Sequence, residues 1–297
     1  MNKVAIVTDS SSGFSPEEAE RLGIKIMYIP FIIDGEEYVE NKNLTREKFF
    51  ELLENANTFS TSQPSQEITR QCWDELLKTY EQLVYIPISS GLSATCKISQ
   101  ASAKNYNGRV EVVDNKRVSV TLKAAVLNAL VMAEEGKSAQ EIKQALETDT
   151  FNSSIYITVT TLKYLKRGGR ITATAAAIGS LLKIKPVLQI QGDKLDSFAK
   201  VMTMQQAKSK MINAIQKDLD TRFKKFYDNG EIAITVAHSG ITNENALAFA
   251  EEVKKVFPKL EFTFVDSLPL SIICHIGQDS LAVAVYKKYK NSTKILK

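Results

Sequence analysis

Short apolar runs rich in β-branched residues alternate with amphipathic helical patterns through the first half of this chain. The runs Lys3–Thr8, Leu83–Ile88 and Val110–Val113 predict buried strands. Helical patterns stand between or after them, for example over Gln66–Tyr80 and Val118–Glu135. Because parallel strands need helical crossovers, this alternation predicts an α/β fold with a mostly parallel sheet flanked by helices.

The pattern changes near residue 150. There Pro186–Gln191 and Ser197–Val201 flank a Gly-Asp turn, which predicts a hairpin and therefore an antiparallel pair. Strands of both kinds mixed with clustered helices are typical of an α+β domain. We therefore expect an N-terminal α/β domain over residues 1–150 and a C-terminal α+β domain with a mixed sheet over residues 151–297.

Composition excludes several classes of protein. Of the 297 residues, 44% are apolar and 24% charged, and the formal net charge is only +4. These values are those of an ordinary globular chain, and they favour neither a disordered protein nor a nucleic-acid binder. The three cysteines are widely spaced, and Val4–Val7 is too short for a signal peptide. The longest uncharged apolar-leaning stretches, Ile171–Leu182 and Ser267–Gln278, are also too short to cross a membrane. We expect a cytoplasmic protein with no transmembrane segment.

No cofactor or metal motif is present. The chain has two histidines, His238 and His275, and neither belongs to a zinc-binding spacing. A phosphate-binding P-loop and a dinucleotide-binding glycine motif are both missing, and only 13 glycines occur. The prediction is a protein without a cofactor, a metal ion or a nucleotide site of its own.

Positive charge is concentrated in one part of the sequence. Between residues 160 and 210 there are ten Lys or Arg against two Asp, a net +8, so the rest of the chain sums to −4. Such a surplus is typical of a solvated face, or of a surface that meets an anion or an acidic partner. Arg170 is distinct because it follows Gly168-Gly169 and precedes an alanine-rich helical pattern, Thr172–Leu182.

Three loops rich in hydroxyl groups follow predicted strands or precede predicted helices. They are Thr8–Gly13, Thr61–Ser65 and Ser89–Thr95. Any one of them is explained by ordinary helix capping. Ligands of open α/β sheets nevertheless bind at the carboxyl ends of strands, where free amides at a helix start favour anions. Together the loops predict a polar pocket for a carboxylate or phosphate, to which Arg170 and His275 are candidate additions.

One enzymatic alternative uses the same residues. The segment Gly91-Leu92-Ser93-Ala94-Thr95 is similar to the G-x-S-x-G nucleophile elbow, and Ser93, Asp266 and His275 follow the chain order of an α/β-hydrolase triad. The final glycine and an oxyanion loop are missing, however, and the strand pattern is not that of a hydrolase. A serine hydrolase with Ser93 as nucleophile therefore stays an alternative.

Five segments in order closely resemble the DegV family, the acyl-binding subunits of bacterial fatty acid kinases. Each segment is short, but their order along the chain is specific, and His275 extends the match toward the C-terminus. The segments are Thr8-Asp9-Ser10-Ser11, Thr61-Ser62-Gln63-Pro64-Ser65, Ser89-Ser90-Gly91-Leu92-Ser93-Ala94-Thr95, Tyr164-Leu165-Lys166-Arg167-Gly168-Gly169-Arg170-Ile171 and Ile184-Lys185-Pro186-Val187-Leu188.

The resemblance implies that one long-chain fatty acid lies in a tunnel between two domains. The implied binding residues are Thr61, Ser62, Ser93, Arg170 and His275, with the hydroxyls of Thr61 and Ser93 on the carboxylate. It also implies that the protein is not itself an enzyme. A separate ATP-dependent kinase subunit docks and converts the carboxylate into an acyl phosphate for phospholipid synthesis. A lipid-sensing regulatory module is a further alternative.

Two positions depart from the family pattern. Ala94 stands where the family usually has glycine, and Gly277-Gln278-Asp279 replaces the usual Gly-Pro-Gly after His275. We expect Ala94 to narrow the approach to the head group and Asp279 to bring a negative charge near His275.

Overall fold

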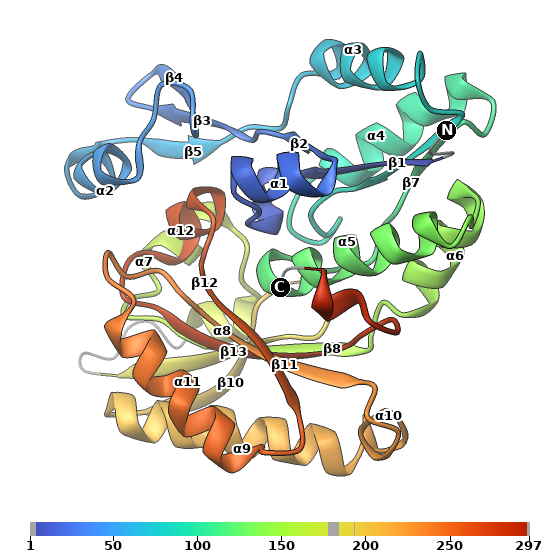
Figure 1. Ribbon diagram of the computed structural model, residues 1–297. Coiled ribbons are helices and arrows are strands. Elements are labelled where there is room, and N and C mark those ends of the chain that lie inside the picture. The colour runs from blue at the N-terminus through green and yellow to red at the C-terminus, as the bar shows by residue number, and fades with distance from the viewer. Residues whose placement is uncertain (1–3, 178–183, 193, 296–297) are drawn as a thin grey trace. The chain divides into compact units, whose positions relative to one another are not determined.

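The computed structural model describes residues 4–177, 184–192 and 194–295, which fall into two compact units (Figure 1). Unit 1 contains residues 1–150 and two later segments, Pro269–Cys274 and Asn291–Lys297. Unit 2 contains Phe151–Leu268 and His275–Lys290. Two short segments from the end of the sequence therefore belong to the unit built by its first half.

The main sheet of unit 1 is parallel throughout, with the strand order β2-β1-β6-β7, and this confirms the predicted α/β architecture. Helices α3 and α4 cover one face and α5 and α6 the other (Figure 1). Trp73, Tyr85 and Cys96 are fully buried between the sheet and the first helix pair. The elements are β1 (Val4–Asp9), η1 (Ser10–Ser12), α1 (Pro16–Leu22), β2 (Ile24–Met27), α3 (Gln66–Leu76), β6 (Gln82–Ile86), α4 (Thr95–Ala103), η2 (Lys104–Tyr106), β7 (Val110–Val112), α5 (Ser119–Glu134), α6 (Ala139–Thr148) and η4 (Ser292–Lys294).

Local chemistry sets several of these helix boundaries. Before α1, the Ser15 hydroxyl accepts from the Glu18 amide at 3.1 Å while the Glu18 carboxylate accepts from the Ser15 amide, a capping box that satisfies two otherwise free donors. Gly23 ends the same helix in the left-handed conformation, with φ of 64°. Helix α6 begins with an equivalent capping box.

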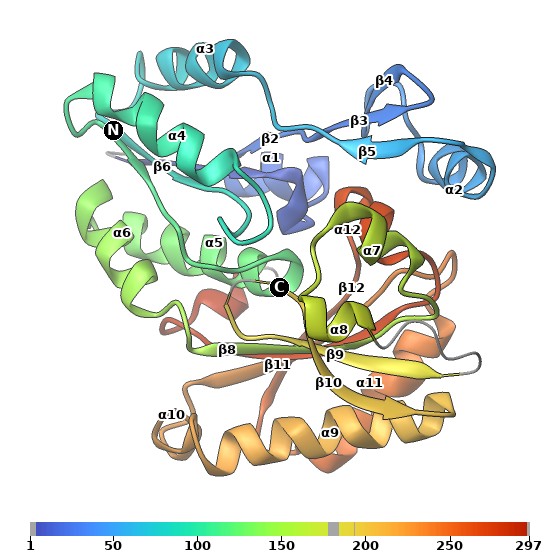
Figure 2. The same cartoon turned by 180° about the vertical axis from the view of Figure 1, so that it is seen from behind.

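A smaller antiparallel sheet in unit 1 has the order β4-β3-β5 and packs with α2 (Figure 2). Its strands are β3 (Pro30–Ile33), β4 (Glu36–Val39) and β5 (Phe59–Thr61), and α2 spans Arg46–Asn55. Phe31, Phe49 and Phe59 pack edge to face at centroid distances of 5.4–6.2 Å. Strand β5 lies in a segment that the sequence pattern presents as a polar loop, and its pairing with β3 places Thr61 opposite Phe31.

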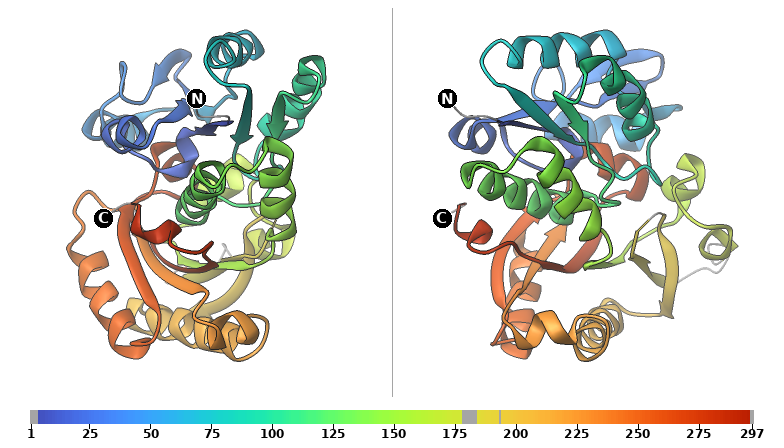
Figure 3. Two further views of the ribbon diagram at one scale, coloured as in Figure 1. Left: turned by 45° about the vertical axis from the view of Figure 1, so that its right-hand side comes forward. Right: turned by 90° about the vertical axis from the view of Figure 1, so that its right-hand side faces the viewer.

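Unit 2 is built on a mixed sheet with the order β10-β9-β8-β13-β11-β12, as predicted for the second half of the chain. Helices α9 and α11 pack on one face of it (Figure 3). The predicted hairpin is present as the antiparallel pair β9–β10, although Asp193 of its turn lies outside the described residues. The elements are β8 (Ser153–Thr158), α7 (Lys163–Gly168), α8 (Ala173–Ala177), β9 (Lys185–Ile190), β10 (Asp196–Val201), α9 (Met204–Asp220), α10 (Lys224–Asp228), β11 (Ile232–His238), α11 (Glu244–Val256), β12 (Glu261–Ser267) and β13 (Leu281–Lys287).

Three expectations from local pattern need correction or restriction. The sequence pattern over 204–226 predicts one long helix, but this helix is interrupted, because Thr221 leaves helical geometry and its hydroxyl donates to the Lys217 carbonyl at 2.6 Å. The second part of the alanine-rich pattern, 178–182, lies outside the described residues. Helix α12 (Leu270–Ile276) was not expected, because its sequence is mostly apolar and shows no separation into an apolar and a polar face.

Candidate functional site

The carboxylate of Asp9, at the end of β1, holds two loops of unit 1 together. Its Oδ2 accepts the Ile88 amide beyond β6 at 2.8 Å, and its Oδ1 accepts the Ser11 amide at 3.0 Å and the Ser11 hydroxyl. Complete burial raises the pKa of Asp9 to about 6, and the three hydrogen bonds act in the opposite direction. Asp9 therefore anchors the Ser89–Thr95 loop to the end of the first strand.

The side chains of the serines after Asp9 also form hydrogen bonds with backbone groups of the fold. Ser10 accepts from the Ile29 amide at 3.0 Å, and Ser12 donates to the Asp9 carbonyl at 2.8 Å. All three serines of the short helix η1 are buried. The side chains of the first predicted hydroxyl loop are thus used in bonds within the fold, one of which holds the Ile88 end of the Ser89–Thr95 loop.

Ser93 lies in a tight turn ahead of α4. The amides of Leu92 and Ser93 both donate to the Ser89 carbonyl, at 3.0 and 3.1 Å, so α4 begins at Thr95, although the helical pattern of the sequence begins at Leu92. Ala94 occupies the N-cap position and supplies no side-chain cap. The half-buried Ser93 hydroxyl instead bonds to Thr95, accepting its amide at 3.3 Å and meeting its Oγ1 at 2.9 Å.

Thr61 and Ser62 end the small sheet of unit 1. Thr61 is half-buried at the end of β5, and the Ser62 amide donates to the Pro30 carbonyl at 3.0 Å, which continues the pairing with β3 by one residue. The Ser62 side chain is exposed. Ser65, three residues on, caps α3 by accepting the Ile68 amide.

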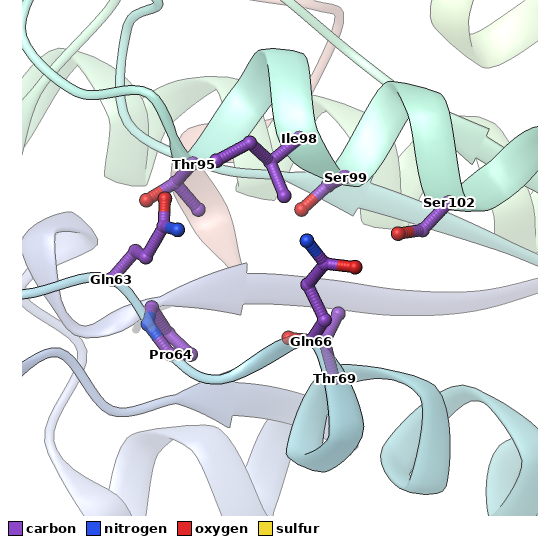
Figure 4. Close-up of a pocket in the computed structure, with 8 residues that line it drawn as sticks. All are labelled: Gln63, Pro64, Gln66, Thr69, Thr95, Ile98, Ser99 and Ser102. Atoms are coloured by element: carbon purple, nitrogen blue, oxygen red, sulfur yellow. The ribbon is translucent and has the colours of Figure 1, made fainter.

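A polar cleft in unit 1 is lined by both loops (Figure 4). Gln63 and Pro64 come from the Thr61–Ser65 loop, and Thr95 comes from the start of α4. The cleft is small, about 10 Å³, which is the space of about one water molecule. Its lining residues are Gln63, Pro64, Gln66, Thr69, Thr95, Ile98, Ser99 and Ser102. The fold thus brings the loop of Thr61 and Ser62 against the loop of Ser93, and each of Thr61 and Ser93 stands two residues from the cleft.

Arg170 lies in unit 2, directly after the left-handed Gly169 that ends α7. Its guanidinium donates to the Gly168 carbonyl, and its own carbonyl accepts the Leu195 amide at 3.3 Å. The side chain is half-buried. Backbone bonds on both sides therefore hold this arginine in place.

His275 is in the last turn of α12 and belongs to unit 2 together with Arg170. Its ring packs on Gly168 so closely that a Cβ added there would lie 2.6 Å from Nδ1. Burial, followed by the positive charges of Arg170 and Arg167, lowers the pKa of His275 to about 4. The ring is therefore neutral at neutral pH.

The expected effect of Asp279 on His275 differs from the observed electrostatics. The charges that shift the pKa of His275 are the two arginines. The Asp279 carboxylate instead lies beside Gly240, with Oδ1 3.6 Å from the position of an added Cβ. The backbone of Asp279 is in the left-handed region, with φ of 57°.

The predicted site residues thus form two groups. Thr61, Ser62 and Ser93 lie on neighbouring loops of unit 1, and Arg170 and His275 lie together in unit 2.

The hydrogen bonds of Ser93 hold its hydroxyl in place but do not activate it as a nucleophile. A serine nucleophile needs a general base as its hydrogen-bond partner. Here the Ser93 hydroxyl bonds to Thr95, which has no basic group. Within the described ranges, no cluster of three or more His, Cys, Asp or Glu has the arrangement of a metal site. None of the helices in this same part of the chain is both long and apolar enough to cross a membrane.

Sequence reasoning did not single out three side chains of this region. They are Asp9, Gln63 and Thr95, and all three stand inside the motif segments. The sequence feature that could have indicated them is a polar side chain next to a glycine, a proline or the end of a strand. Such a side chain is often buried and then needs a hydrogen-bond partner nearby. Which partner it takes depends on the pairing of loops.

The chain belongs to the DegV family. Residues 3–288 match the profile of the family described as "Uncharacterised protein, DegV family". A DegV domain-containing protein of Clostridium acetobutylicum is 31% identical over 288 residues, which cover 95% of this chain and 97% of the relative. A DegV domain-containing protein of Staphylococcus aureus is 29% identical over 97% of this chain and 100% of its own.

Solved structures of the family have the same fold. The structure of a DegV family protein from Thermus thermophilus, described as fatty acid binding, superposes with a TM-score of 0.85 at 27% identity and covers 96% of this chain and 99% of its own. DegV of Bacillus subtilis, described as a fatty acid binding protein, gives a TM-score of 0.80 at 28% identity, with the same shares covered.

Proposed function

We propose that this protein binds a long-chain fatty acid and presents its carboxylate to a separate ATP-dependent kinase subunit. The observation that carries the proposal is that two hydroxyl loops of unit 1 meet at the start of α4. In a chain of the DegV family, whose members from Thermus thermophilus and Bacillus subtilis are described as binding fatty acids, this is the place for the acid group.

The hydroxyls of Thr61 and Ser93 bind the carboxylate, and the exposed Ser62 stands at the edge of the same loop. Neutral donors suit this role because they orient the anion without neutralising it. A carboxylate held by hydroxyls keeps more of its nucleophilicity than one held in a close ion pair. The tunnel between the two domains that the resemblance implies stays a prediction.

Affinity comes mainly from the acyl tail. Burial of each CH₂ contributes about 0.8 kcal/mol, so a sixteen-carbon chain supplies roughly 10 kcal/mol before the entropy of binding is subtracted. The head group needs orientation more than additional affinity.

The phosphorylation of the carboxylate is catalysed by the kinase subunit. A carboxylate oxygen bonds to the γ-phosphorus of ATP, the bond from that phosphorus to the β–γ bridging oxygen breaks, and ADP leaves. Arg170 and the neutral His275 border the head group and stabilise the charge that develops on the transferred group. The positive segment 160–210 of the sequence, with a net charge of +8, suits an acidic surface of the kinase subunit.

The first test is chemical analysis of the protein as purified from a bacterial host. We expect organic extraction and mass spectrometry to return one equivalent of a fatty acid, whose mass identifies the acyl chain. A folded protein without any acyl species contradicts the proposal.

The second test addresses the residues. With ATP, an ATP-dependent fatty acid kinase subunit and palmitate, the protein yields an acyl phosphate that hydroxylamine traps as a hydroxamate. Thr61→Ala combined with Ser93→Ala abolishes the product. Ser65→Ala, which removes a hydroxyl from the same loop but one that only caps α3, retains it. Binding of palmitate without any acyl phosphate indicates a lipid-sensing module, and covalent labelling of Ser93 by a fluorophosphonate indicates a hydrolase.

A further inference from the structure

The Ser89–Thr95 loop, which carries Ser93, is bonded to a second loop of unit 1. This second loop consists of residues 113–118 between β7 and α5, and we call it the β7–α5 loop. The Ser89 amide donates to the Arg117 carbonyl at 3.0 Å, and the Ser89 carbonyl accepts the Ser93 amide at 3.1 Å. The backbone position of Ser93 therefore depends on the β7–α5 loop.

Two charged side chains of the β7–α5 loop hold Ser90. Asp114 Oδ1 accepts the Ser90 amide at 3.2 Å, and the Lys116 ammonium donates to the Ser90 hydroxyl. The two charged groups also form an ion pair with each other, with 3.0 Å between Lys116 Nζ and Asp114 Oδ2. Ser90 is thus held through both its backbone and its side chain, three residues before Ser93.

The β7–α5 loop also holds the chain beyond Ser93. The Cys96 thiol, in the first turn of α4, donates to the Val113 carbonyl at a sulfur–oxygen distance of 3.9 Å. The loop therefore makes hydrogen bonds on both sides of Ser93, whose own hydroxyl bonds to a neighbour two residues away.

Both members of the ion pair are constrained by these contacts. Lys116 has a left-handed backbone, with φ of 55°, which is unfavourable for a lysine and persists only where surrounding interactions hold it. Burial would raise the pKa of the Asp114 carboxyl, but its bonds with Ser90 and Lys116 outweigh burial and hold that pKa below its ordinary value. The carboxylate is therefore ionised at neutral pH.

We propose that Asp114 and Lys116 are positioning residues that hold the Ser89–Thr95 loop so that the Ser93 hydroxyl meets the carboxylate of the bound fatty acid. They act through Ser90 and the turn that follows it, and not by contact with the ligand. A small displacement of a positioned group is enough to weaken what it does. The inference deepens the proposed function and rests on it.

The test uses two variants and a matched control. Lys116→Gly keeps the left-handed turn, which glycine adopts readily, and removes only the side chain with its ammonium. Asp114→Asn keeps an oxygen for the Ser90 amide but removes the negative charge that pairs with Lys116. Glu111→Gln is the control, because Glu111 of β7 pairs with Lys143 at 2.9 Å with side chains 20% and 28% exposed, against 20% and 27% for Asp114 and Lys116.

Two ligands separate the acid group from the acyl tail. They are palmitate and 1-hexadecanol, which has the same number of carbons but no carboxylate, and their dissociation constants are measured with delipidated protein. Lys116→Gly and Asp114→Asn weaken palmitate binding about three- to tenfold, because a hydrogen bond to an anion is misplaced. Binding of 1-hexadecanol changes by less than about twofold, since its hydroxyl both donates and accepts and adapts to a shifted Ser93. Glu111→Gln changes neither constant by more than about twofold.

A double-mutant cycle with Ser93→Ala tests whether Lys116 acts through Ser93. If Lys116 positions Ser93, then Lys116→Gly has no further effect on palmitate affinity once the Ser93 hydroxyl is absent. If the ammonium attracts the carboxylate directly through its charge, the two losses of affinity multiply instead.

The outcomes are distinguishable. Unchanged palmitate affinity of Lys116→Gly overturns the inference, as do losses that multiply in the cycle, an equal loss in Glu111→Gln, or an equal loss of 1-hexadecanol binding. In each of these cases tight binding of palmitate by the wild-type protein still supports the proposed function. Failure of the wild-type protein to bind palmitate overturns both.

Discussion

His275 is harder to protonate in the folded protein than in the unfolded chain. Replacing it by glutamine therefore makes the free energy of unfolding depend less on pH in the acidic range. The pKa of His275 falls from its ordinary value of 6.5 to about 4, because of burial and the charges of Arg170 and Arg167. Since the folded-state pKa is the lower one, the unfolded chain binds one more proton between these values. Stability is therefore complete above pH 6.5 and is lost as the pH falls toward 4.

The magnitude follows from the pKa difference. Each pH unit below 6.5 costs about 1.4 kcal/mol, so at pH 5 the wild-type protein has lost at most about 2 kcal/mol through His275. Asp9, with a pKa of about 6, and Glu40, with a pKa of about 7, also titrate in this range, but with the opposite sign, because burial raises both. Only the difference between wild-type and variant isolates the histidine.

Urea unfolding at pH 7 and pH 5 measures that difference. We expect the free energy of unfolding of His275→Gln, relative to the wild-type protein, to rise by up to about 2 kcal/mol between pH 7 and pH 5. Arg167→Gln removes one of the two cations, raises the pKa of His275 and gives an intermediate change. If the difference in free energy of unfolding between His275→Gln and the wild-type protein is the same at both pH values, the lowered pKa of His275 is refuted.

Two further predictions concern backbone and loop anchors. Gly277→Ala destabilises the protein by more than about 2 kcal/mol in the same urea assay, because its φ is +81° and the added Cβ would lie 2.7 Å from the Tyr164 ring. Gly23→Ala is the control: its φ is +64° but no atom lies within 4 Å of the added Cβ, so it costs only about 1 kcal/mol. In Asp9→Asn, the NH₂ group of asparagine replaces one of the carboxylate oxygens that accept the Ser11 and Ile88 amides, so that two donors face each other. We expect this to lower the free energy of unfolding by about 1–3 kcal/mol and to weaken palmitate binding measured by calorimetry. Unchanged affinity would mean that Asp9 does not position the Ser93 loop.

Much of the fold was predictable because its signals are local. Runs of β-branched residues such as Val4–Val7 indicated the strands of the parallel sheet, and the capping box of Ser15 and Glu18 indicated the start of α1. The hairpin of β9 and β10 was predictable from the Gly-Asp turn between them. Each of these depends on side chains within a few positions of one another.

Elements that depend on distant partners were not predictable in this way. Strand β5 has three residues and no pattern of its own, and it exists because Phe31 and its neighbours pair with it. The end of α9 follows the buried Asp218, whose carboxylate accepts from Ser154 and Tyr156 of β8. Neither partner can be inferred from the residues around the element itself.

The sequence by itself determined which hydroxyls, glycines and cations stand at strand ends and helix starts, since hydrogen-bonding capacity and backbone freedom belong to the individual residue. Only the tertiary structure decided which of them meet. It placed Gln63 in one cleft with Thr95, and it set His275 on Gly168 beside two arginines, which makes the ring neutral. The physical reason is that the direction of a hydrogen bond and the pKa of a buried group depend on all neighbouring atoms, and packing brings most of those from remote parts of the chain.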